Sequence, residues 1–234
     1  MILIKNAYIK PMVGEDIENG SILLLYGASA IPMSVFIDAE GRLVTPGCVE
    51  AHCHIGLHNE AVGWEGRDYN ESIDPITPQM RAIDSIYPQD EAFGNAIRGG
   101  VTSACTGPGS ANVIGGQFVA MKTFGKSVDE MAFKEPAALK CALGENPKNV
   151  YGNSKRTPQT RMATAAILRQ AFIDAENYRN EMFSDKPPKR SLKNEILVKA
   201  LNKEIPVKFH AHRADDIMTA IRIAKEFDLS SGST

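Results

Sequence analysis

The sequence predicts an α/β fold, in which a (β/α)8 barrel of the TIM type, incomplete in this chain, follows a small β element. Strand-like runs separated by turn residues fill residues 1–45. Over residues 46–234, apolar strand-like runs alternate with helical stretches, which is typical of βα units with parallel strands. The chain ends in SSGST directly after a helical stretch, and a complete barrel usually needs about 250 residues. We therefore expect the sequence to be truncated.

The β element, residues 1–45, contains three strand-like runs joined by turns of the types Glu-Asn-Gly and Glu-Gly. The runs span 2–9, 21–27 and 34–44. Pro46 and Gly47 then break the apolar pattern and mark the passage into the predicted barrel, residues 46–234.

The first half of the predicted barrel contains one helix and four strands. The helix spans 88–100, with Pro88 in its first turn and Gly99 at its C-terminal end. The strands are expected at 49–55, 101–106, 116–123 and 137–144.

Two helices and a strand come next. Thr157 is the expected N-cap of the first helix and Pro158 its first residue. Its apolar positions recur every four residues, at Ala163, Ile167, Ala171 and Ala175. The second helix starts at Ser191, and a strand over 205–211 follows it. The side chains that this helix should bury are Ile196, Leu197, Ala200 and Leu201.

The last helix is expected to be capped by Asp215 or Asp216. Its inward face would carry Ile217, Ala220, Ile221 and Ala224.

Composition excludes several classes of protein. Lys plus Arg is 26 and Asp plus Glu is 28, a formal net charge of −2, so we expect a small-molecule substrate, no nucleic acid and no anionic membrane. Lys5 and Lys10 interrupt the apolar N-terminus, so neither a signal peptide nor a membrane span is expected, and the predicted location is cytoplasmic. The cysteines have no CxxC spacing and suit reduced, buried thiols; they are Cys48, Cys53, Cys105 and Cys141.

Four of the five histidines form two His-x-His pairs at the ends of predicted strands. Residues two apart on a strand share a face, so His52 lies beside His54, and His210 beside His212. Two imidazoles on one strand can hold a divalent cation, whereas a single pair is about as often a polar surface feature. Two pairs in equivalent positions favour a metal site. His58 lies beyond the strand and is expected to be a loop residue.

The stretches TPGCVEAHCHIG and GGVTSACTG resemble the amidohydrolase superfamily, in particular its imidazolonepropionase-like and prolidase-like branch. The resemblance covers nearly the whole chain. It implies a metal-dependent hydrolase whose barrel lies beside a small β-sandwich made from both ends of the chain. It also implies that a metal-activated water attacks an amide-like carbon of the substrate.

The resemblance assigns metal ligands by position. His52 and His54 match the first-strand ligands, and His210 matches the fifth-strand histidine. The fourth strand should supply a bridging group, for which Glu145 is favoured over a carbamylated Lys140. His212 then touches substrate or orients a ligand. Zinc is the expected metal, as one ion or two, with iron or manganese as alternatives.

The resemblance also shows what this chain lacks. A sixth-strand histidine and the aspartate that acts as general base would both lie beyond Thr234, so no catalytic base is assigned. Tyr151, Arg161 and Arg213 follow strand ends and are candidates to bind substrate, the two arginines through a carboxylate.

These features predict a hydrolase of carbon–nitrogen bonds, in an amide or a cyclic amide. The alternatives are a deaminase of the same superfamily and a non-catalytic metal-binding fragment without the general base. An incomplete barrel leaves an unpaired strand edge, so a homo-oligomer is also expected.

Overall fold

The computed structural model describes residues 1–25 and 35–233, and the chain divides into two compact units, Met1–Cys48 and Val49–Thr234. The predicted strand positions 26, 27 and 34 lie outside the described residues.

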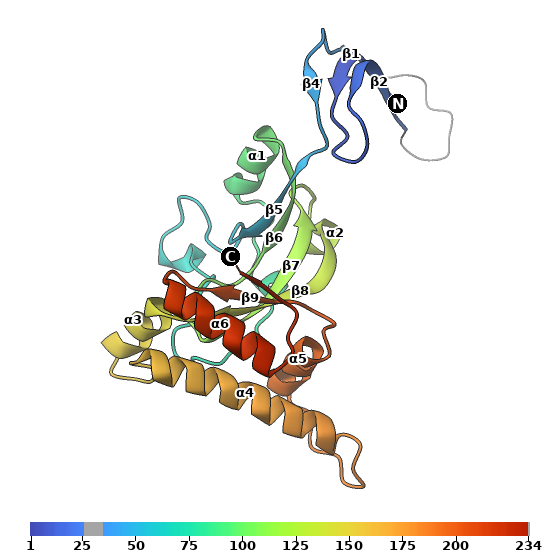
Figure 1. Ribbon diagram of the computed structural model, residues 1–234. Helices are drawn as coiled ribbons and strands as arrows, with labels where there is room; N and C mark the ends of the chain where they lie inside the picture. The colour runs from blue at the N-terminus through green and yellow to red at the C-terminus, as the bar shows by residue number, and fades with distance from the viewer. Residues whose placement is uncertain (26–34, 234) are drawn as a thin grey trace. The chain divides into compact units, whose positions relative to one another are not determined.

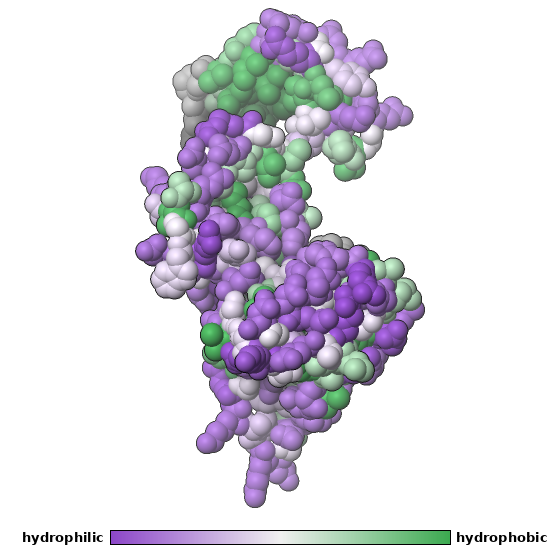
Figure 2. Space-filling view, turned by 90° about the vertical axis from the view of Figure 1, so that its left-hand side faces the viewer, coloured by the Kyte–Doolittle hydropathy of each residue, from purple (hydrophilic) through white to green (hydrophobic). Residues whose placement is uncertain are grey.

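The first unit is a small sheet around β1 (Ile2–Ile9). This strand pairs antiparallel with β2 (Ile17–Leu24) and parallel with β3 (Val35–Asp38) and β4 (Leu43–Val44). Its core is small, with Ala7, Ile9 and Ala39 buried. Many of its larger apolar side chains are exposed (Figure 2), including Leu23, Val35, Phe36, Ile37 and Leu43.

The second unit is built on one mixed sheet with the strand order β10-β9-β8-β7-β6-β5. The strands are β5 (Cys48–Cys53), β6 (Val101–Thr106), β7 (Ile114–Lys122), β8 (Ala132–Ala142), β9 (Val207–His210) and β10 (Ser231–Ser233). Strands β8, β9 and β10 are parallel, but β7 is antiparallel to both β6 and β8. The prediction of uniformly parallel βα units is therefore wrong at β7. The link over 107–113 is too short for the crossover of about a dozen residues that parallel neighbours need.

The first helix of this unit is α1 (Glu91–Arg98). The Asp90 carboxylate accepts a hydrogen bond from the Ala92 backbone N–H at 2.8 Å, and Gly99 ends the helix as predicted. Pro88 precedes the cap, so its predicted place in the first turn is wrong. The shorter helices are η1 (Trp64–Gly66), η2 (Ala82–Asp84) and α2 (Val128–Met131).

The longer helices are α3 (Glu145–Asn153), α4 (Arg161–Glu181), α5 (Leu192–Leu201) and α6 (Ala214–Glu226). Ser191 caps α5 as predicted, but α4 is capped by the Thr160 hydroxyl, which accepts from the Ala163 N–H at 3.0 Å. The predicted start at Thr157 and Pro158 is wrong, because these residues lie in the turn before the cap.

Helix α6 begins after Arg213, which caps it without a side-chain hydrogen bond. Asp215 and Asp216 lie in the first turn, so the predicted cap is wrong there too. No helix among the described residues is long and apolar enough to cross a membrane.

Helices α4, α5 and α6 cover one face of the sheet beside β8 and β9 (Figure 1). Leu139 and Cys141 of β8, and Val207 and Phe209 of β9, belong to the core under these helices. Alternate residues of a strand point to opposite faces, so Lys140, Lys208 and His210 point the other way.

Most of the predicted helical core is buried: in α5 all four predicted residues, and in α6 Ala220 and Ala224. Ile217 and Ile221 are 36% and 39% exposed, so their predicted burial is wrong. Cys141 is buried but Cys48 is exposed, which corrects the expectation of four buried thiols.

The sheet is strongly curled. The Lys208 ammonium on β9 donates a hydrogen bond to the backbone carbonyl of Ala51 on β5, although three strands separate β9 from β5 in the sheet order. One side chain spans that distance only if the sheet curves round toward itself. The sheet is therefore a half-barrel, and the face opposite the helices is concave.

Truncating Phe172 should test the core under the helices. Phe172 is 0% exposed, so Phe172→Ala should lower the free energy of unfolding by about 3–5 kcal/mol in urea titrations. Phe183 follows α4 and is 90% exposed, so Phe183→Ala is the matched control. This substitution should change the free energy of unfolding by less than about 0.5 kcal/mol. Equal effects of the two substitutions would contradict this packing.

Candidate metal centre

Three histidines and one lysine gather on the concave face of the curled sheet. His52 lies in β5, His54 directly after it, His210 at the end of β9 and Lys140 in β8. The Lys140 Nζ is 3.2 Å from His52 Nε2, and the rings of His52 and His54 are 5.5 Å apart. The structure thus brings together three predicted metal ligands and the alternative bridging residue.

The tautomer of His54 is set by a backbone carbonyl. Its Nδ1 lies 2.6 Å from the carbonyl oxygen of Gly107, which can only accept a hydrogen bond, so Nδ1 carries the hydrogen. Burial lowers the pKa of His54, an effect that the Gly107 bond opposes and the Lys140 charge reinforces. The neutral ring therefore keeps a lone pair on Nε2, in the orientation that second-shell carbonyls commonly impose on metal-binding histidines.

His52 is held in a partly buried setting with one unsatisfied nitrogen. Its Nε2 is within hydrogen-bond distance of Lys140, and its buried Nδ1 has no hydrogen-bond partner in the part of the chain that the structure describes. The ring packs 5.0 Å from that of Phe118. Burial first, then the positive charges of Lys140 and Lys208, lowers the pKa of His52 to about 3. His52 is neutral at physiological pH.

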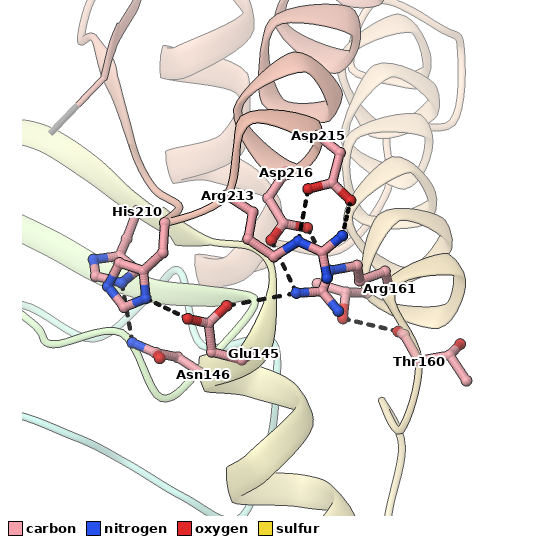
Figure 3. Close-up of polar contacts among 10 residues, drawn as sticks. Glu145, Asn146, Thr160, Arg161, His210, Arg213, Asp215 and Asp216 are labelled. Atoms are coloured by element: carbon pink, nitrogen blue, oxygen red, sulfur yellow. Dashed lines mark hydrogen bonds and ion pairs between the residues drawn. The ribbon is translucent and has the colours of Figure 1, made fainter.

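His210 is the third neutral imidazole. Burial first, and then the Lys140 charge, lowers its pKa to about 4. The Asn146 amide donates a hydrogen bond to His210 Nε2 at 3.0 Å (Figure 3). The ring of His212 lies 4.5 Å away.

Lys140 is 0% exposed, and within the described part of the chain no carboxylate pairs with its ammonium. Burial lowers its pKa to about 8, with the nearby Cys141 opposing and Lys208 reinforcing the shift. A buried lysine without an acidic partner is unusual, because desolvating the charge is costly. This lysine is therefore a candidate for a chemical role.

Glu145 lies outside this cluster. It is the first residue of α3, and its carboxylate bonds to His212 Nδ1 and forms a 3.6 Å ion pair with Arg161 (Figure 3). The hydrogen bond from His212 is the main reason that its pKa is lowered. Glu145 therefore contacts His212 and Arg161 in place of the predicted metal ligands.

The predicted substrate-binding side chains are also engaged elsewhere. Arg161 makes two hydrogen bonds to Asp216, at 2.8 and 3.2 Å, and Arg213 makes two to Asp215. Tyr151 is buried, and its hydroxyl donates to the Asn112 amide oxygen. Each of these side chains already has a partner within the protein. His58 is exposed in a loop, stacked on the ring of Tyr69.

No three His, Cys, Asp or Glu side chains over residues 1–25 and 35–233 converge closely enough to hold an ion. The centre instead combines three neutral imidazoles with a lysine. Two residues of this centre were missed from the sequence, Asn146 and Lys208. Lys208 was detectable, because it shares a strand face with His210.

No protein-family model matches the chain. The chain is 32% identical over 227 residues to "Amidohydrolase tasK" of Hapsidospora irregularis, which covers 86% of this chain and 23% of that protein. A solved structure, the crystal structure of an amidohydrolase from Thermotoga maritima MSB8, matches with a TM-score of 0.90 and 42% identity. That match covers all of this chain and 64% of the other. The chain thus spans less than two thirds of either relative.

The bond between Arg161 and Asp216 should stabilise the helices behind the centre. Asp216 is 3% exposed, so Asp216→Ala leaves a guanidinium without its partner and should lower the free energy of unfolding by about 2 kcal/mol. The neighbouring Asp215 forms an exposed ion pair with Arg213. Asp215→Ala should therefore lower the free energy of unfolding by less than about 1 kcal/mol. Chemical denaturation of the two variants measures the difference, and a larger loss for Asp215→Ala would refute it.

Proposed function

We propose that this chain belongs to the amidohydrolase family and carries the metal-binding half of a hydrolase that cleaves a carbon–nitrogen bond of a small molecule. The similarity to two proteins named amidohydrolase supports a hydrolase of this family. The proposed dependence on a metal rests on one observation, the cluster of three neutral imidazoles around Lys140.

The donor chemistry of the cluster suits a divalent metal, although its side chains would have to move closer together than the structure shows in order to bind one ion. A metal needs unprotonated imidazole nitrogens, and burial keeps His52, His54 and His210 neutral. The unsatisfied Nδ1 of His52 is a second sign that this site is arranged for something other than packing. Nitrogen-rich ligation favours zinc, as one ion or two, with iron or manganese as alternatives.

We further propose Lys140, in place of Glu145, as the bridging group. Lys140 contacts His52, whereas the carboxylate of Glu145 is held by His212 and Arg161. A neutral lysine amine can attack the carbon of carbon dioxide. A nitrogen–carbon bond forms, one carbon–oxygen double bond becomes a single bond to an anionic oxygen, and the amine proton leaves to water. The resulting carbamate offers two oxygen ligands and removes the uncompensated positive charge from the concave face.

When bound, the metal would act as a Lewis acid that polarises the scissile carbonyl and makes water more acidic. The chain's own residues position the reaction. Gly107 holds the ring of His54 in one tautomer, and the ring of Phe118 packs against that of His52. His212 is placed to orient Glu145 at the edge of the centre. No residue of this chain is assigned the role of general base.

Two alternatives use the same centre. A deaminase would direct the activated water at an amine-bearing carbon, and a non-catalytic protein would bind metal without turnover. Metal content followed by hydrolysis of a panel of small amides and amine-bearing heterocycles separates the three. We also propose a homo-oligomer in the cytoplasm, with a small molecule and neither nucleic acid nor membrane as its ligand.

His52→Ala and His54→Ala should each lower the zinc bound per chain at least about tenfold, because each removes a ligand. Metal is measured by inductively coupled plasma mass spectrometry after dialysis. His58→Ala is the matched control, since His58 lies in the following loop and should leave metal content unchanged. Unchanged zinc in both His52→Ala and His54→Ala would refute the site.

The two candidate bridging groups can be told apart by substitution. Lys140→Met keeps the side-chain volume but removes the amine, and it should lower zinc uptake and abolish any stimulation by bicarbonate. Glu145→Gln should retain both. With ¹³C-labelled bicarbonate, a carbamate resonance should appear in the wild type and be absent from Lys140→Met. The reverse pattern, with metal lost only in Glu145→Gln, would restore Glu145 as the bridging group.

A further inference from the structure

A cleft of about 330 Å³ opens beside His54. It lies within the second unit, between the segment that follows η1, the β6–β7 link and helix α3. Its polar lining consists of His54, Tyr69, Asn70, Ser110, Asn146 and Asn149. This volume is at the lower end of the range for small-molecule sites, so the cleft can hold a compact group next to the metal centre.

The amide of Asn70 is fixed at one wall of the cleft. Its Oδ1 accepts a hydrogen bond from the Ala111 backbone N–H at 3.1 Å, and its NH₂ group has no acceptor among residues 1–25 and 35–233. Gly109 makes this placement possible, because a Cβ at Gly109 would lie 2.6 Å from Asn70 Oδ1. The Asn70 side chain is therefore held in position before any ligand arrives.

The opposite wall, helix α3, supplies two more amides. Asn146 donates its NH₂ to His210 Nε2, so its oxygen is left as an acceptor near the proposed metal ligands (Figure 3). Among the described residues, the Asn149 side chain has no partner and lies exposed at the cleft. The hydroxyl of Ser110, a partly buried residue, has no partner among these residues either. The cleft thus combines donors and acceptors that belong to uncharged groups.

The lining that the structure describes contains no Lys, Arg, Asp or Glu side chain. The arginines that could have met a carboxylate are paired with Asp216 and Asp215. An anionic group in this cleft would lose hydration without gaining a cationic side chain from the lining. Neutral amides can instead exchange matched hydrogen bonds with the asparagines.

We infer that this cleft is the substrate subsite and that it selects a neutral amide or ureide group over a carboxylate, with Asn70 and Asn149 as the specificity-determining residues. The inference rests on the proposed function, because it takes the adjoining metal centre as the place of reaction. It replaces the substrate-carboxylate contact that was predicted for Arg161 and Arg213.

Two probes of nearly equal shape test this selectivity: N-acetylglycinamide, which is neutral, and N-acetylglycine, which is an anion. Their affinities for the zinc-loaded full chain are measured by ligand-observed NMR titration. Asn149→Leu removes the hydrogen bonds and should weaken binding of the neutral probe about fivefold. Asn149→Lys adds a cation and should strengthen binding of the anionic probe about fivefold or more.

Asn153→Lys is the matched control, because Asn153 lies in the same helix and does not line the cleft. A carboxylate can also reach a bound metal, but that contact is the same in both lysine variants and cancels in their comparison. The inference is overturned if Asn149→Leu leaves neutral-probe affinity unchanged, or if both lysine variants strengthen anion binding equally.

Zinc content, measured on the same samples, separates this inference from the proposed function. If the chain binds zinc but the Asn149 substitutions do not change probe affinity as expected, the proposed subsite is refuted and the proposed hydrolase is not. If the chain binds no zinc but probe affinity still changes with the Asn149 substitutions, the proposed hydrolase is refuted. The role of the cleft as a substrate site is then refuted with it.

Discussion

The curl of the second sheet is the constraint on which the candidate metal centre depends. The hydrogen bond from Lys208 to the carbonyl oxygen of Ala51 spans that curl. Without the curl, β5 and β9 would lie three strands apart, and their histidines would face open solvent at separate places. With it, the histidines of both strands and Lys140 of β8 meet on one concave face. The core under α4, α5 and α6 supports this curvature from the other side.

The same curvature sets the electrostatics of the centre. Two lysines, Lys140 and Lys208, point into a partly desolvated space, and both lower the pKa of His52. Burial and like charge act in the same direction on an imidazole, since each disfavours its protonated form. A concave face with surplus positive charge and neutral imidazoles suits either a carbamate on Lys140 or anionic metal ligands. Glu145 does not provide that charge, because it is held by His212 and Arg161.

Much of the element order could be predicted from periodicity and end signals, but the existence of α3 could not. The apolar run of β7 has the same pattern in either direction, but the short link before it allows only an antiparallel pairing with β6. Helix α3 contains Pro147 and Gly152 and has little local preference for helix. Buried Tyr151, bonded to Asn112, holds it in place through tertiary contacts. The start of α4 was misplaced because Thr157 and Thr160 are both plausible caps by sequence.

The sequence by itself placed His52 beside His54 and His210 beside His212, because the two-residue period of extended backbone is a local property. The rings of the two pairs lie 5.5 and 4.5 Å apart, although His54 and His212 follow the strand ends. The family resemblance implied two candidates for a bridging group, Glu145 and Lys140. Only the tertiary structure decided between their positions. The two residues are five apart along the chain, yet one points from β8 into the concave face and the other starts α3 beside Arg161. Which distant groups a side chain meets is set by sheet curvature and helix packing, and neither is encoded in local spacing.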